Sequence, residues 1–154
     1  CTTIQVDFNI PERFDVKYID KEGNFRVPIL IHRAIFGSLE RFFGILIEQY
    51  KGNFPFWLAP EQLRILPIGD RHIDFAITVK NRLDRNFRVH IDERTEKINR
   101  KIRDAEDEKV PYMVIIGDKE TTSGQVSVRQ HQKGMLGSMS IEKMEKLFND
   151  ELEK

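Results

Sequence analysis

The stretch GNFPFWLAP, residues 52–60, constrains the fold more than any other feature, because it divides the chain into two parts. Its two prolines and its glycine favour extended backbone and interrupt both helices and strands. We therefore expect two domains, residues 1–52 and 61–154, joined by a linker at 53–60. The 154 residues suffice for one compact domain with a smaller piece attached.

The second part alternates short apolar runs with segments of helical periodicity. The apolar runs predict buried strands at 62–68, 87–92, 112–117 and 125–130. A Thr-Ser-Gly turn joins the last two strands into a hairpin, and helix-spaced apolar residues lie between the earlier strands and near the C-terminus. The resulting order β-α-β-α-β-β-α predicts an α/β fold, in which a mixed β-sheet is flanked by helices.

The first part predicts antiparallel strands followed by a helix. The strands are expected at 2–8, 15–19 and 26–35. Ser38 is a candidate N-cap for an amphipathic helix, because apolar residues repeat at helical spacing from 39 to 50. The chain begins without methionine, and its first residues already alternate as a strand does, so we expect a segment of a longer protein.

Composition excludes several classes of protein. A hydrophobic content of 40% with 11 phenylalanines indicates a globular protein, and no apolar run approaches the ~20 residues of a membrane-spanning helix. A single cysteine excludes an internal disulfide and favours a reducing, cytoplasmic location. Lys and Arg together number 25, as do Asp and Glu, so any nucleic-acid binding must depend on local patches of charge.

Six stretches carry a resemblance to a known family. In chain order they are TIQVDFNIPERF, PILIHRAIFGSLERFFGILIE, FPFWLAP, VPYMVIIGDKE, GQVSVR and LGSMS. Their order and spacing resemble threonyl-tRNA synthetases over essentially the whole chain. The resemblance implies that residues 1–52 end a class II catalytic core, with its third signature motif, and that residues 61–154 form an anticodon-binding domain. The His-Arg-Ala at 32–34 favours threonine over proline, histidine and glycine.

The resemblance also implies roles for residues of the catalytic part. His32 matches one of three protein ligands of an active-site zinc, whose open positions bind the amino and hydroxyl groups of threonine. Arg41 matches a catalytic arginine that clamps ATP and stabilises charge during adenylation. Gly37 would let the backbone approach the nucleotide, and Thr3 and Gln5 match positions facing the adenylate pocket. Without the resemblance, His32 reads as a hydrogen-bonded structural histidine and Arg41 as a solvated helix residue.

A full-length enzyme of this kind would activate threonine with Mg²⁺-ATP and transfer it to tRNA-Thr, and we expect it to be a homodimer. The other two zinc ligands and the first two class II motifs would lie upstream of this chain. We therefore expect the chain alone to bind zinc poorly and to catalyse nothing.

Two residues of the second part are matched to anticodon reading. In the family, the residues at Glu120 and Arg129 read the central and third anticodon bases, which suits a carboxylate and a guanidinium facing unstacked bases. The predicted hairpin would hold the two side by side, so the alternative is a cross-strand surface ion pair.

The charged segment 92–109 supplies further candidates for RNA contact. By the resemblance these are Lys97, Arg103 and Lys109, whereas the sequence alone favours a solvated helix with internal ion pairs. Thr95 stands where the family commonly has the Asn that contacts a base, and it offers only a hydroxyl.

Two alternatives to a ligase remain open at this point. One is a non-catalytic protein that keeps the fold as an RNA-binding or scaffold module, and the other is a different class II synthetase with the same appended domain. Three further histidines have no metal-ligand spacing and are predicted to be surface residues, namely His72, His90 and His131.

Overall fold

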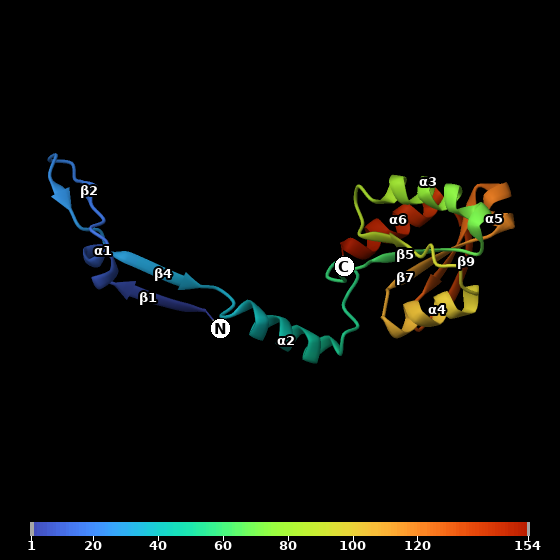
Figure 1. Ribbon diagram of the computed structural model, residues 1–154, viewed down its shortest axis with the longest axis horizontal. Coiled ribbons are helices and arrows are strands. Elements are labelled where there is room, and N and C mark those ends of the chain that lie inside the picture. Colours follow the sequence, from blue (N-terminus) through green and yellow to red (C-terminus); the bar gives the residue numbers. More distant parts are fainter. Residues whose placement is uncertain (1, 154) are drawn as a thin grey trace. The chain divides into compact units, whose positions relative to one another are not determined.

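The computed structural model describes residues 2–153 and divides into two compact units, with the division between Gln49 and Tyr50. Figure 1 shows the elements of each unit. The first unit contains short strands and two helices, and the second contains a five-stranded sheet with helices on both faces.

The first unit is built on an antiparallel ribbon of strands β1 (Thr3–Asp7) and β4 (Leu30–Ala34). The remaining elements are α1 (Asn9–Arg13), the hairpin of β2 (Tyr18–Ile19) and β3 (Phe25–Arg26), and α2 (Leu39–Tyr50). The predicted strand at 26–35 is therefore two strands with different partners, and Pro28, which cannot donate to a ladder, lies between them. Ser38 accepts a hydrogen bond from the Arg41 N–H at 3.2 Å, as expected of an N-cap.

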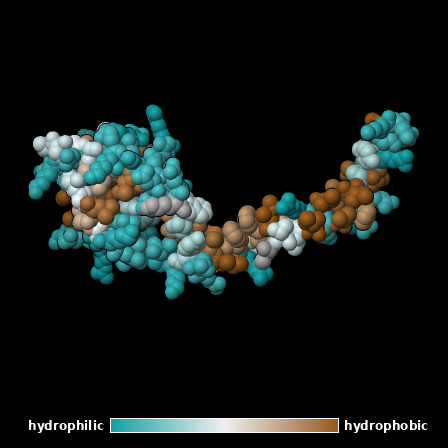
Figure 2. Space-filling view, turned by 180° about the vertical axis from the view of Figure 1, so that it is seen from behind, coloured by the Kyte–Doolittle hydropathy of each residue, from teal (hydrophilic) through white to brown (hydrophobic). Residues whose placement is uncertain are grey.

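Most apolar side chains of the first unit are exposed. Ile4 and Ile31 are 65% and 68% exposed, and Pro11 is the only buried residue in the described part of this unit. Figure 2 shows hydrophobic side chains along its surface, in contrast to the mainly hydrophilic surface of the second unit. Two-stranded ribbons and a single amphipathic helix cannot enclose a core by themselves.

The second unit contains a mixed sheet with the strand order β6-β5-β7-β8-β9. Strand β5 is parallel to β6 and β7, whereas β7, β8 and β9 are antiparallel. The elements in chain order are β5 (Leu63–Pro67), the 3₁₀ turn η1 (Asp70–His72), α3 (Ile73–Leu83), β6 (Val89–Ile91), α4 (Ile98–Asp107), β7 (Tyr112–Ile116), α5 (Asp118–Ser123), β8 (Gln125–Gln130), β9 (Gly134–Ser140) and α6 (Ile141–Leu152).

Side chains of the central strands alternate between two hydrophobic cores. Leu63 and Ile65 of β5 pack in the larger core with residues of α3 and α6, whereas Leu66 packs in the smaller core with residues of α4. Accordingly, α3 and α6 lie on one face of the sheet and α4 on the other (Figure 1). On β8 the alternation places Val128 in the larger core and leaves Ser127 and Arg129 on the α4 face.

An aromatic cluster closes the larger core, and one member comes from the predicted linker. The ring centroid of Phe56 lies 5.5 Å from that of Tyr112 and 5.7 Å from that of Phe148. Phe56 is only 6% exposed, and its carbonyl accepts from the Gln62 side chain at 2.9 Å. Residues 53–60 contain no helix or strand, as their prolines predict, but they pack on the second unit.

The mixed sheet flanked by helices is confirmed, and the structure adds the 3₁₀ turn η1, helix α5 and strand β9 to the predicted order. Helix α5 replaces the expected tight turn between β7 and β8, and it ends at Gly124, whose φ of 69° is left-handed. Strand β9 contains Gly134 and Gly137, so its sequence does not alternate as most strands do. It pairs with β8 over a register shift at Val128/Arg129.

Candidate nucleic-acid interface

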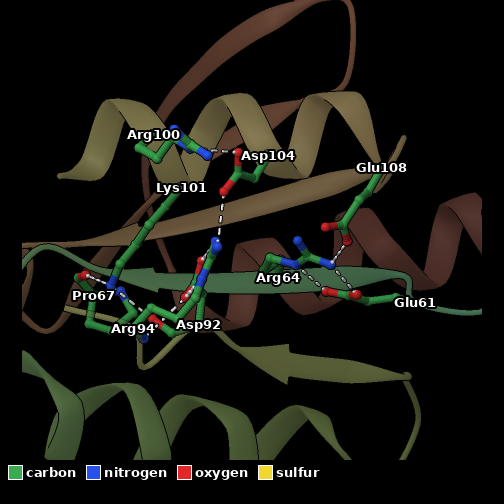
Figure 3. Close-up of polar contacts among 9 residues, drawn as sticks. All are labelled: Glu61, Arg64, Pro67, Asp92, Arg94, Arg100, Lys101, Asp104 and Glu108. Atoms are coloured by element: carbon green, nitrogen blue, oxygen red, sulfur yellow. Dashed lines mark hydrogen bonds and ion pairs between the residues drawn. The ribbon is translucent and has the colours of Figure 1, made fainter. Parts of the chain in front are cut away.

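A buried lysine ties together the carboxyl ends of two parallel strands. Lys101 of α4 is 3% exposed, and its Nζ donates to the Pro67 carbonyl at 3.0 Å and to the Asp92 carbonyl at 2.9 Å (Figure 3). Pro67 ends β5 and Asp92 follows β6, so this one side chain fixes the start of both loops at this edge of the sheet. Ligands of α/β sheets commonly bind at such an edge.

The two loops enclose a cavity of about 340 Å³. Its lining includes Gly69 and Asp70 from the first loop and Thr95 and Lys97 from the second. Thr95 and Lys97 are exposed, and Lys97 directly precedes α4. The structure thus brings two of the predicted RNA-contact residues to one hollow of mixed polar and apolar character.

A ladder of ion pairs fixes the second loop against α4 (Figure 3). Arg94 donates to Asp92 at 2.7 Å and to Asp104 at 3.0 Å, and Arg100 donates to Asp104 at 3.1 Å. The hydrogen bonds from Arg94 hold the pKa of Asp92 and that of Asp104 below their ordinary values. The loop backbone beside Thr95 is therefore ordered by groups that are charged at neutral pH.

The Asp92→Asn substitution is expected to lower the free energy of unfolding at neutral pH by about 1–2 kcal/mol, because a charged acceptor of Arg94 is lost. A lowered native pKa stabilises the fold above the ordinary value of 3.8, and this contribution disappears as the pH falls through the native pKa. The difference in the free energy of unfolding between parent and variant should therefore become smaller in acid. Urea unfolding at about pH 7 and about pH 3 measures this difference. The control is Asp84→Asn, at an exposed aspartate. The same difference in unfolding free energy at both pH values for Asp92→Asn would contradict a lowered pKa of Asp92 in the folded chain.

Glu120 lies in α5, where its carboxylate makes two hydrogen bonds. Oε2 accepts from the Gly117 N–H at 2.9 Å, and Oε1 accepts from the Ser127 hydroxyl at 2.7 Å. Burial acts to raise the pKa of Glu120, but these hydrogen bonds lower it overall. Glu120 thus caps its own helix and joins it to β8.

Arg129 does not pair with Glu120, so the alternative of a cross-strand ion pair between these two residues is wrong. Helix α5 connects β7 to β8 in the chain. Glu120 accepts from the Gly117 N–H and the Ser127 hydroxyl, whereas the Nε of Arg129 donates to Glu106 of α4 at 3.0 Å. The two residues nevertheless share the α4 face, because Ser127 and Arg129 are two positions apart on β8. They are separate polar groups along one face.

The other two predicted RNA contacts lie elsewhere on α4 and beyond its end. Arg103 is strongly exposed and lies 3.9 Å from Asp107. Lys109 follows the helix at the end opposite Lys97, and its Nζ donates to the Lys51 carbonyl at 2.9 Å. Lys109 is therefore engaged with the backbone that leads to β5 and is not gathered with Thr95 and Lys97.

Two of the three histidines predicted at the surface are covered. His72 is 2% exposed. Its Nδ1 accepts from the Gly69 N–H at 3.1 Å, and its Nε2 lies 3.1 Å from Asp118 Oδ1. His131 is nearly covered beside Glu106, with 2.6 Å between Nδ1 and Oε2. Only His90 is exposed. Burial by neighbouring loops, which local pattern does not report, explains both corrections.

In the first unit, three predicted site residues share one face of the β1–β4 ribbon. Gln5 is directly opposite His32, and Thr3 is opposite Ala34. Gly37 has a φ of 71°, a left-handed conformation that glycine adopts without strain, and Arg41 lies in the first turn of α2.

The residues around His32 form only part of a zinc site. The Nε2 of His32 lies 3.4 Å from Asp7 Oδ2, and no group of three or more possible metal ligands occurs among residues 2–153. A protein zinc site uses at least three protein ligands. The residues present fit the donation of one imidazole ligand and not a complete zinc site.

No helix in the described part of the chain is both long and apolar enough to cross a membrane. Several residues that organise the interface were missed by sequence reasoning, namely His72, Lys101, Glu106 and Asp118. Each is a charged or polar residue whose partner is distant in sequence. For Lys101 a signal existed, because it falls on the apolar face defined by Ile98, Ile102 and Ala105.

Comparison with known proteins identifies both parts of the chain. Residues 62–151 match the family model of the anticodon binding domain, and residues 1–50 match that of the tRNA synthetase class II core domain (G, H, P, S and T).

Curated relatives and a solved structure agree with these matches. The chain is 51% identical to a threonine–tRNA ligase of Sulfurihydrogenibium sp. over 92% of its length and 22% of the relative's. It is 49% identical to a threonine–tRNA ligase of Clostridioides difficile over 99% of its length and 24% of the relative's. The chain thus spans about a quarter of the relatives' length.

The crystal structure of the RNA binding domain of threonyl-tRNA synthetase from Cryptosporidium parvum is similar, with a TM-score of 0.70 and 34% identity. The similarity covers 97% of this chain and 38% of that chain. The resemblance to threonyl-tRNA synthetases is therefore confirmed, and through residues 62–151 the chain belongs to the family of anticodon-binding domains.

Proposed function

We propose that the chain is the C-terminal part of a threonine–tRNA ligase and that its second domain binds the anticodon of tRNA-Thr. The observation that carries this proposal is the α4 face of the sheet, where Glu120, Arg129 and the cavity beside Thr95 and Lys97 offer several polar contacts. Base edges of a single-stranded loop are recognised by such contacts. The named relatives do not favour a scaffold protein or another synthetase.

In this proposal Glu120 and Arg129 contact the central and third anticodon bases, and Thr95, Lys97 and Arg103 contact the RNA beside them. Lys109 would contact an RNA phosphate after the hydrogen bond from its Nζ to the Lys51 carbonyl opens. In this proposal the catalytic core spans residues 1–52, the linker spans 53–60 and the anticodon-binding domain spans 61–154.

The complete enzyme would be a cytoplasmic homodimer that joins threonine to tRNA-Thr at the expense of ATP, with Mg²⁺ bound to the nucleotide. His32 would supply one ligand to a zinc that binds threonine, completed by residues outside this chain. Arg41 would hold ATP, with Thr3, Gln5 and Gly37 lining the adenylate pocket. Residues 1–154 alone should therefore form no threonyl-tRNA.

Titration of the 154-residue chain with a tRNA-Thr anticodon stem-loop tests the proposal, with an anticodon-scrambled loop as control. We expect tighter binding to the cognate loop, and about 10- to 100-fold loss of that preference in Arg129→Ala, since an arginine contact to a base contributes about 1–3 kcal/mol. Glu120→Gln, which keeps the size of the side chain that caps α5, should also weaken the preference.

Measurements at two salt concentrations separate base reading from phosphate attraction. Equal and salt-sensitive binding to both loops, in the parent chain and in both variants, would contradict anticodon reading and favour a scaffold role. A far-UV circular dichroism spectrum of each variant verifies that the fold is retained.

A further inference from the structure

We propose that Glu106 positions Arg129 for base recognition, an inference that rests on the proposed anticodon-binding function. Glu106 is on α4 and Arg129 is on β8, so the pair joins two different elements of the α4 face. The Arg129 Nε donates to Glu106 Oε1 at 3.0 Å, and both side chains are more than two-thirds buried. Such an ion pair is better shielded from solvent than the exposed pairs of α4.

The carboxylate of Glu106 is itself held by the turn after β8. Its second oxygen, Oε2, lies 2.6 Å from His131 Nδ1 and accepts from the Gln132 N–H at 3.4 Å. The backbone N–H of His131 donates to the Pro111 carbonyl at 2.9 Å, which fixes the turn to the start of β7. Glu106 is therefore a fixed acceptor, with both oxygens engaged.

The charge state of Glu106 agrees with this role. Burial acts to raise its pKa, but the hydrogen bonds from Arg129 and from the Gln132 N–H lower it overall. Glu106 is thus an anion at neutral pH, and it attracts the guanidinium whenever the domain is folded.

The geometry leaves the far end of Arg129 available. A guanidinium has five N–H donors, and Glu106 engages the one on Nε. Among the described residues no other acceptor bonds to Arg129, so the Nη donors remain for a ligand. Fork-shaped pairs of such donors recognise adjacent acceptors on a base edge. The tether would order a long side chain before RNA arrives, which lowers the entropic cost of binding.

The sign of the effect distinguishes positioning from simple electrostatics. A carboxylate near RNA repels phosphates, so a Glu106 without a positioning role should weaken binding, and its removal should tighten binding to every RNA. If Glu106 positions Arg129, Glu106→Ala should instead weaken binding to the cognate loop by about 3–10-fold and leave the scrambled loop little changed.

The experiment measures Kd of the 154-residue chain for cognate and scrambled anticodon stem-loops. Glu106→Gln keeps an acceptor for the Arg129 Nε and should retain most of the cognate preference. The double variant Glu106→Ala/Arg129→Ala should bind no more weakly than Arg129→Ala alone, because the two residues act as one unit. Glu145→Ala is a matched control, because Glu145 accepts from the Arg82 Nε at 2.8 Å on the opposite face of the sheet, and it should change neither Kd.

Tighter or unchanged cognate binding by Glu106→Ala, with Arg129→Ala still losing the preference, would overturn the positioning role and leave the proposed function intact. Retained preference in Arg129→Ala would instead contradict the proposed role of Arg129 itself. NMR of the free parent chain gives a second measurement should Glu106→Ala not fold. The Nε–H of Arg129 should exchange with water at least about 10-fold more slowly than that of exposed Arg103, and equal rates would overturn the tether.

Discussion

The Phe56→Ala substitution is expected to lower the free energy of unfolding of the second unit by about 3–5 kcal/mol, as removal of a buried aromatic ring does. Phe56 contacts the rings of Phe87, Tyr112 and Phe148, which come from three separate places in the chain. The ring packs against all three, so alanine would leave a cavity that its neighbours cannot easily fill. The effect is large for a residue that lies in no helix or strand.

Urea unfolding followed by the fluorescence of Trp57, the only tryptophan in the chain, reports on this unit. Phe25→Ala removes the same atoms from an exposed position and should change the transition by less than about 0.5 kcal/mol. Equal effects of the two substitutions would mean that residues 53–60 are a flexible linker and not part of the domain.

The Lys101→Met substitution is expected to lower the free energy of unfolding by about 2–4 kcal/mol, because two main-chain carbonyls lose a charged donor at a buried site. Methionine has a similar length, so the loss is one of hydrogen bonds and not of volume. The loops after β5 and β6 should also become more mobile, and binding of the cognate stem-loop should weaken with them.

Hydrogen exchange of the amides at 92–97 would detect this mobility in the same variant. Arg100→Met serves as the control, because Arg100 is the exposed neighbour of Lys101 on α4, and its pair with Asp104 contributes less than about 1 kcal/mol. Unfolding of Lys101→Met at the same urea concentration as the parent would show that the loops are fixed by other contacts.

Periodic segments of this chain were predictable, and short segments were not. The apolar spacing of α6 and the strand at 125–130 match the structure closely, because a long pattern with a single period has few alternative readings. Helix α5 has six residues and no apolar face, so only its capping residues could have indicated it. Strand β9 is held by pairing with β8, and this tertiary pairing outweighs the poor strand propensity of its two glycines.

In the candidate site, the charged residues were predictable but their interaction partners were not. Sequence and resemblance selected Glu120 and Arg129, and the structure places both on one face of the sheet. The partners of each charge could not be read from the chain, because Glu106 lies 23 positions from Arg129. Residues such as Lys101 and His72 looked solvated, and only the packing of loops around them makes them internal.

The aromatic cluster also determines when this domain can be completed during protein synthesis. Phe56 leaves the ribosome before Phe148, which is in α6, so the cluster cannot assemble until that helix has emerged. The parallel pairing of β5 with β7 likewise waits for residues 112–116. A nascent chain that stalls before α6 would expose Phe56, Phe87 and Tyr112 to chaperones and proteases, and the domain acquires its stability only as a whole.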